Sequence, residues 1–228
     1  MRRSRGMVLA VVIGSVVLAH GAVAAQADTS TPKSRMMTKA QVPTSFGIAK
    51  NWSYTKKPSD AAKTITLCSD PEGTSMFAIP APRTQYFAES EVTAARKQDY
   101  VSVSERVYRY PSAAEATAAY TQLVQGAATC TGTKATAAGS DPRVTDVFAN
   151  GSSPGGQYQN LWVSDATTFT SKDPQHNGRT ITMTVYSQAG NAIIQTGGSI
   201  NGRPRLTSGQ ADDLQTLAMT LSAQWSPQ

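Results

Sequence analysis

Cysteine and histidine are scarce in this chain, which contains two of each among its 228 residues. His20 lies within residues 1–27, which have the pattern of an export signal described below. His176 is therefore the one histidine of the predicted mature chain. A single histidine excludes most histidine-rich metal sites and most acid–base schemes that use two histidines. The H-E-x-x-H, EF-hand, Walker A and dinucleotide-binding patterns are also absent. We therefore expect no metal, no cofactor and no enzyme activity.

Excess charge of one sign is equally limited. The net charge of +6 includes three leader arginines that no leader acid balances, so the remainder carries +3. No run of five like charges occurs anywhere in the chain. A surplus this small does not favour nucleic acid or anionic lipid as a partner, and we expect no nucleic-acid binding.

The first 27 residues have the pattern of a secretory signal. Three arginines within the first five residues precede an apolar run, Met7–Ala19, and a small-residue stretch that ends at Ala27. The apolar run is short against the roughly 20 residues of a membrane-spanning helix. We expect cleavage after Ala27, with Ala24 as the alternative site, and a secreted protein without a membrane span. An uncleaved signal anchor is the alternative interpretation.

The mature chain is long enough for one domain with a sizeable core. Residues 28–35 contain no apolar side chain and predict a flexible lead, so we place the domain at residues 36–228. Alternating or β-branched segments predict strands at Thr64–Cys68, Met76–Ile79, Tyr100–Tyr110, Arg143–Ala149, Tyr158–Val163, Arg179–Tyr186 and Ala192–Ile200. Residues 131–142 and 150–156 are predicted loops. The expected fold class is α+β, a single domain with an antiparallel sheet packed with flanking helices.

Two helices carry clear signals and a third a weak one. Ser112 and Glu115 form a capping box, and the apolar residues that follow recur on one face as far as Ala127. A second helix is predicted from an N-cap at Ser208 to Trp225. Residues 87–97 are a weaker helix prediction.

Cys68 and Cys130 are expected to form one disulfide, because both follow the export signal. The loop that they close spans 62 positions, and the chain-entropy model assigns such a crosslink on the order of 4 kcal/mol. A pair of free thiols, one of them nucleophilic, is the alternative interpretation.

Residues 151–155 match the G-x-S-x-G pattern of serine hydrolases, with Ser153 as nucleophile. Asp165 or Asp173 and then His176 follow in the order of an α/β-hydrolase triad. However, the residue after the nucleophile must donate a backbone N–H to the oxyanion, and Pro154 has none. The pattern therefore favours a loop, and a secreted serine hydrolase is a minor alternative.

The strand pattern also predicts a threonine and aromatic surface on one face of the sheet. Its candidate ligand-binding residues are Tyr158, Trp162, Thr182 and Tyr186. In this interpretation, the opposite face carries the aliphatic side chains of the same strands. The alternative is that helices cover the aromatic face and that Trp162 belongs to the core.

The order of these features resembles the extracellular sensor domain of mycobacterial PknH-type receptor serine/threonine kinases and its secreted or lipoprotein relatives in actinobacteria. The residues that carry this resemblance are Met37–Pro43, Trp52, Cys68, Val101–Val107, Tyr110–Ala116, Cys130 and Trp162. The resemblance covers about residues 36–225 and implies an α+β domain, a ligand cleft and no enzyme activity. This chain lacks the cysteines for the second disulfide that is usual in the kinase sensor domains, and it contains no kinase domain.

The leading functional hypothesis is a secreted, non-catalytic binding domain of the sensor type. Its expected partner is a small molecule or a component of the cell envelope. A secreted protein–protein interaction or inhibitor module is the second hypothesis.

The intact mass of the secreted protein tests the leader and the disulfide together. Without reductant, the chain should begin at Asp28 and be lighter than the dithiol form by a pair of hydrogens. Alkylation of the native protein by a thiol reagent would contradict the disulfide, and a retained leader would contradict export with cleavage.

Overall fold

The computed structural model describes residues 32–47, 52–55, 62–93, 100–155, 158–203 and 205–226. The predicted leader, residues 1–27, lies outside this part, as do residues 28–31 of the predicted flexible lead. The rest of that lead forms α1 (Pro32–Arg35), one helical turn. Two short 3-10 turns follow, η1 (Lys39–Gln41) and η2 (Thr44–Phe46).

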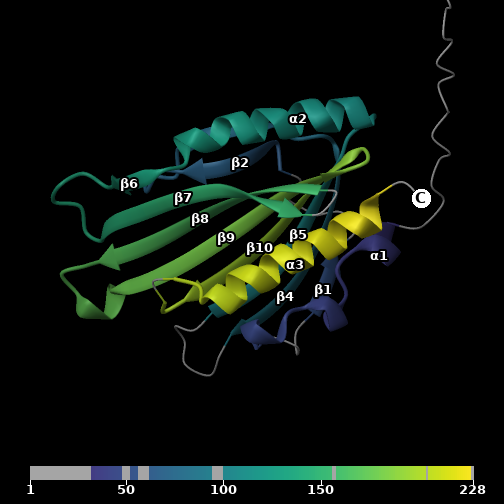
Figure 1. The fold of residues 1–228 in the computed structure, drawn as a ribbon. Coiled ribbons are helices and arrows are strands. Elements are labelled where there is room, and N and C mark those ends of the chain that lie inside the picture. The colour runs from purple at the N-terminus through teal and green to yellow at the C-terminus, as the bar shows by residue number, and fades with distance from the viewer. Residues whose placement is uncertain are drawn as a thin grey trace, which may run out of the picture.

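The described strands form a large antiparallel sheet and a separate hairpin (Figure 1). The large sheet has eight strands in the order β1-β4-β5-β10-β9-β8-β7-β6, and the hairpin pairs β2 with β3. The bounds are β1 Trp52–Thr55, β2 Thr64–Ser69, β3 Ser75–Pro80, β4 Thr84–Thr93, β5 Tyr100–Arg109, β6 Gly132–Ala135, β7 Arg143–Gly155, β8 Tyr158–Thr170, β9 Gly178–Ala189 and β10 Ala192–Asn201. The predicted α+β domain with an antiparallel sheet and flanking helices is confirmed.

Both faces of the sheet are covered (Figure 1). The long helix α3 (Ser208–Trp225) and the N-terminal turns lie on one face, and α2 (Ala113–Gly126) lies with the β2–β3 hairpin on the other. Alternate residues of β5 supply the two cores, so Val103 and Val107 point toward α3 while Tyr108 points toward α2. No helix within the described residues is long and apolar enough to cross a membrane.

The helix α2 begins where its capping sequence predicts. The Ser112 side chain accepts a hydrogen bond from the backbone N–H of Glu115 at 3.2 Å. The helix passes into a short turn, η3 (Ala127–Thr129), which ends at Cys130. Cys130 forms the predicted disulfide with Cys68 of β2, with 5.8 Å between the Cα atoms, and therefore ties the end of the helix to the hairpin.

The other helix predictions need correction. The N-cap of α3 is Thr207, one residue before the predicted Ser208, and Thr207 forms a capping box with Gln210. The predicted helix at residues 87–97 is wrong over its described part, because residues 84–93 form β4 and pair throughout with β5. Residues 94–97 lie outside the described residues. Ten consecutive cross-strand pairs outweigh the weak helix propensity of this segment.

Two predicted loops are also partly strand. The expected loop at residues 131–142 contains β6, and the expected loop at residues 150–156 continues β7 as far as Gly155. β6 pairs with β7 only up to Phe148, so beyond that residue one side of β7 has no strand partner within the described part of the chain. A free edge tolerates Pro154, whose missing N–H interrupts no ladder there.

Two helical glycines allow a matched test of this packing. A Cβ atom on Gly126 of α2 would lie 2.2 Å from the Phe77 ring, whereas a Cβ atom on Gly209 of α3 would meet nothing within 4 Å. Gly209→Ala should therefore raise the free energy of unfolding by up to about 1 kcal/mol through helix propensity. Gly126→Ala should lower it by about 1–3 kcal/mol because the ring must move. Urea denaturation measures both changes, and a stabilising Gly126→Ala would contradict the close contact.

Candidate functional site

An open cleft lies at the end of the sheet where three connections meet. It has a volume of about 620 Å³, within the roughly 300–1,000 Å³ typical of ligand sites. We call it the arginine cleft, and its lining residues are Pro80, Ala81, Pro82, Arg83, Thr84, Arg109, Tyr110, Pro111 and Asn191. They come from the β3–β4 connection with the strand residues on either side of it, from the end of β5 and the β5–α2 connection, and from the β9–β10 turn.

The first wall of the cleft is held by Gln85, a buried residue at the start of β4. Its amide nitrogen donates to the backbone carbonyls of Pro82 and Ala62, each at 2.8 Å. Its amide oxygen accepts from the backbone N–H of Ala62 at 3.1 Å. Three hydrogen bonds from one buried amide fix the β3–β4 connection before any ligand arrives.

The opposite wall is held by Asn191. Its side-chain nitrogen donates to the carbonyl of Tyr110 at 2.8 Å, and its own carbonyl accepts from the backbone N–H of Tyr110 at 2.8 Å. The turn that presents Asn191 contains Gly190 in the left-handed region, with φ of 53°. These contacts join the β5–α2 connection to the β9–β10 turn, so the cleft is preorganised on both sides.

The cleft is positively charged. Arg83 and Arg109 both line it, and Thr84, which follows Arg83, is the cross-strand partner of Arg109, so the backbones of the two arginines lie close together at this end of β4 and β5. No ion pair or hydrogen bond engages either side chain within the described part of the chain, and the lining includes no acidic residue. Burial and then repulsion from Arg109 lower the pKa of the nearby Arg35.

Two further features favour negative charge here. The Tyr110 hydroxyl is buried and has no hydrogen-bond partner among the described residues, and burial raises its pKa to about 12, so it keeps its proton. Pro111 directly precedes the cap of α2, which places the N-terminus of that helix beside the cleft. A helix N-terminus carries a partial positive charge.

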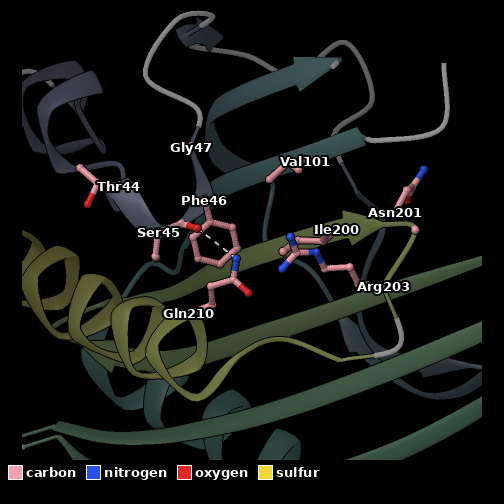
Figure 2. A pocket seen from close by; sticks show the side chains of 10 residues that line it. Thr44, Ser45, Phe46, Gly47, Val101, Ile200, Asn201, Arg203 and Gln210 are labelled. Carbon is pink, nitrogen blue, oxygen red and sulfur yellow. Dashed lines mark hydrogen bonds between the residues drawn. The ribbon is translucent and has the colours of Figure 1, made fainter. Parts of the chain in front are cut away.

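A second pocket, of about 340 Å³, lies at the other end of β5 and β10 (Figure 2). The Gln210 side chain crosses it and donates to the carbonyl of Ser45 at 3.0 Å. Arg203 extends along Ile200 on its other side. Residues 48–51, 94–99 and 204, which adjoin its lining in sequence, lie outside the described residues. We therefore base no function on this pocket.

The structure separates the predicted threonine and aromatic surface. Trp162 is the cross-strand partner of Val185, and Leu161 is the partner of Tyr186, so Trp162 and Tyr186 point to opposite faces. The prediction of one shared face is wrong, because alternation within each strand does not reveal the register between strands. A register change of one residue exchanges the faces.

Each predicted residue of that surface has a different environment. Trp162 packs partly buried against the α3-side core, with its indole over Gly151, where a Cβ atom would lie 2.6 Å from the ring. Tyr186 is buried in the α2-side core, and its hydroxyl donates to the carbonyl of Thr66 at 3.1 Å. Thr182 donates to the Ser199 hydroxyl at 3.3 Å. The side chain of Tyr158 lies outside the described residues. Ligand binding by these four residues stays a prediction.

The residues of the hydrolase alternative lie far apart. Ser153 on β7 pairs with Asn160 near the start of β8, whereas His176 belongs to the turn η4 (Pro174–His176) beyond the end of β8. Ten residues of β8 separate Asn160, the partner of Ser153, from Thr170 at the end of the strand nearer His176. This length corresponds to about 33 Å at the usual rise per residue. His176 instead faces Asp173, with 3.7 Å between Nδ1 and Oδ2.

Four acidic residues gather on the α2 face without forming a metal site. Burial, and secondarily repulsion from Asp146, raises the pKa of Asp165 to about 7. Burial also raises the pKa of Asp146, with smaller contributions from Asp70 and Glu72 in the β2–β3 turn. The described residues contain no group of three or more His, Cys, Asp or Glu that could hold a metal ion.

Sequence reasoning missed a buried carboxyl on the α3 face. Glu105 of β5 is fully buried, and its Oε2 accepts from the backbone N–H of Met37 at 2.5 Å. Its Oε1, the cross-strand Thr196 hydroxyl and the Trp225 indole N–H have no partner of hydrogen-bond geometry among the described residues. Burial raises the pKa of Glu105 to about 7, although the Met37 amide and the nearby Trp225 indole lower it in part.

Glu105 makes stability depend on pH. Its pKa is about 7 in the folded chain and near 4.3 in an unfolded one, so unfolding releases a proton between these values. The free energy of unfolding should therefore fall as pH rises from about 4.5 to about 7, and level off above that range. Glu105→Gln, which keeps an acceptor for Met37, should remove on the order of 3 kcal/mol of this fall.

Urea denaturation at pH 4 and pH 8 measures the change. Glu115→Gln, at an exposed glutamate of α2, is the control and should follow the original chain. Identical pH profiles for Glu105→Gln and the original chain would contradict the buried, protonated carboxyl.

Comparison of the sequence with protein-family models and with curated proteins gives no match. Among solved structures, the extracellular domain of PknH from Mycobacterium tuberculosis is similar to this chain with a TM-score of 0.46 and 12% sequence identity. The alignment covers 84% of this chain and 94% of that chain.

Proposed function

We propose that this protein is an exported, non-catalytic binding domain of the sensor type that holds its ligand in the arginine cleft. The observation that carries the proposal is the pair of arginines, Arg83 and Arg109, which lack ion-pair partners within the described residues. They line a cleft whose two walls are held in place by the side-chain hydrogen bonds of Gln85 and Asn191. A preorganised cleft with convergent polar groups is the usual form of a small-molecule site.

The chemistry of the lining supports binding rather than catalysis. Its side chains are prolines, an alanine, two arginines, a tyrosine, a threonine and an asparagine. A guanidinium group has only hydrogen-bond donors, and burial raises the pKa of Tyr110 to about 12, so its hydroxyl also stays a donor at neutral pH. Thr84 has no base beside it within the lining, whereas a hydroxyl nucleophile needs one. The side chains that line the arginine cleft are therefore suited to hold and orient a ligand.

The export signal and the disulfide support an extracytoplasmic location for this function. The pattern of residues 1–27 predicts secretion, and the Cys68–Cys130 bond is of the kind that persists in oxidising compartments. The alternative of a protein-interaction module has less support. The large apolar side chains exposed among the described residues are Val124 on α2 and Val147 on β7, which point to opposite sides of the molecule.

A thermal-shift screen with a blocked cleft tests the proposal. Thr84→Trp places a large ring in the mouth of the cleft at an exposed lining position. Thr133→Trp is the matched control, because Thr133 is an exposed threonine on the edge strand β6. The panel contains sugars, amino acids, organic acids and phosphate esters, each at millimolar concentration.

At least one compound should stabilise the original chain and Thr133→Trp but not Thr84→Trp. A ligand at roughly 100 times its Kd stabilises the folded state by about 2.7 kcal/mol, which a thermal scan detects. A panel without any shift, or a shift that Thr84→Trp retains, would contradict binding in this cleft.

A further inference from the structure

We propose that the ligand of the arginine cleft is an organic anion, a carboxylate or phosphate group joined to an apolar body. This inference rests on the proposed function and adds the chemical class of the ligand. Arg83 and Arg109 bind the charged group, and the proline-rich walls contact the apolar body.

The electrostatics of the cleft carry the first half of the inference. Two guanidinium groups line it without an acidic neighbour in the lining, and Arg35 lies close enough to Arg109 for the repulsion to lower its pKa. The N-terminus of α2, beside Pro111, adds partial positive charge from the other face of the sheet. All of these contributions have one sign, so an anion relieves the repulsion while a cation adds to it. Guanidinium groups also match the planar geometry of carboxylate and phosphate oxygens.

The residues that form the walls support the second part of the inference, that the ligand has an apolar body. Pro80, Pro82 and Pro111 lack backbone N–H groups, and Ala81 uses its own to donate to the carbonyl of Lys63 at 2.9 Å. These walls therefore present apolar surface and few hydrogen-bond donors beyond the two arginines. A purely polar ligand such as a neutral sugar would leave its hydroxyl groups poorly matched against them. An apolar or aromatic body satisfies the walls, and the anionic group satisfies the arginines.

The two arginines are accessible to such a ligand. Arg83 is exposed and Arg109 is half-buried, with its backbone in the ladders of β4 and β10. Replacement of either guanidinium by the shorter Gln amide removes a charge at a position where no described ion pair depends on it. The variants Arg83→Gln and Arg109→Gln should therefore keep the fold, which circular dichroism and an unchanged unfolding temperature verify.

Calorimetric titration with defined probes tests the class of ligand. The probes are phenyl phosphate and benzoate as anions with an apolar ring, benzyl alcohol and benzylamine as neutral and cationic counterparts, and inorganic phosphate. Arg179→Gln is the matched control, because Arg179 is an exposed arginine at the opposite end of the sheet.

Phenyl phosphate or benzoate should bind the original chain and Arg179→Gln equally, and bind Arg83→Gln and Arg109→Gln at least tenfold more weakly. Benzyl alcohol, benzylamine and inorganic phosphate should each bind at least tenfold more weakly than the aromatic anion. Vesicles that contain phosphatidylglycerol form a separate arm. Arginine-dependent sedimentation with them, tighter than phenyl phosphate binding, identifies a lipid headgroup as the source of the anion, and its absence identifies a free small molecule.

Three results would overturn the inference. They are equal binding of the neutral or cationic ring, anion binding that both arginine variants retain, and no binding of either aromatic anion. If the screen with Thr84→Trp still finds a cleft ligand of another class, the proposed function stands and only this inference fails. If that screen also finds none, both fail.

Discussion

The antiparallel pairing of β5 with β10 joins the two halves of the sheet, and the positions of both pockets follow from it. On one side of this ladder lie β1 and β4, and on the other lies the continuous meander from β6 to β9. The ladder runs from the pair Arg109–Ala192 to the pair Val101–Ile200. The arginine cleft lies at its first end and the second pocket at its other end, about 27 Å away at the usual rise per residue.

The same ladder fixes what each face must bury. Because side chains alternate along β5, Glu105 faces α3 beside Thr196, while Tyr108 faces α2 and donates from its hydroxyl to the Gln195 side chain at 2.9 Å. The α2 face needs a cover that belongs to neither half of the sheet, and the separate β2–β3 hairpin supplies it. The Cys68–Cys130 disulfide and the hydrogen bond from Tyr186 to Thr66 attach that hairpin. A disulfide and a hydrogen bond thus help the apolar core of this face to hold a hairpin that does not pair with the main sheet.

Sequence patterns predicted the elements well where the signal is local. Alternation and β-branched composition located β5, β9 and β10, and the Ser112 cap located the start of α2. The failures share one cause. The strand β4, the extension of β7 and the relative faces of β8 and β9 all depend on pairing partners distant in sequence. Local residues do not encode that register.

The arginine cleft belongs to the same class of hidden feature. Arg83, Arg109 and Asn191 become neighbours only because Thr84 pairs with Arg109 and Arg109 pairs with Ala192. The one local signal was proline, since Pro80, Pro82 and Pro111 mark the places where strands stop and connections cross the sheet end. Prolines at the ends of strands predict a surface with few backbone N–H donors, but they do not show which charged side chains will lie beside that surface.

The arrangement has an energetic cost that points to a use. Two arginines in one cleft concentrate positive charge, and a carboxylate among the lining side chains would offset that charge within the fold. Described carboxylates lie elsewhere, at Asp146 and Asp165, where burial raises both pKa values and repulsion from Asp146 adds to the rise at Asp165. A cleft that keeps two arginines without an ion-pair partner among the described residues would, in the proposed function, take the balancing negative charge from its ligand.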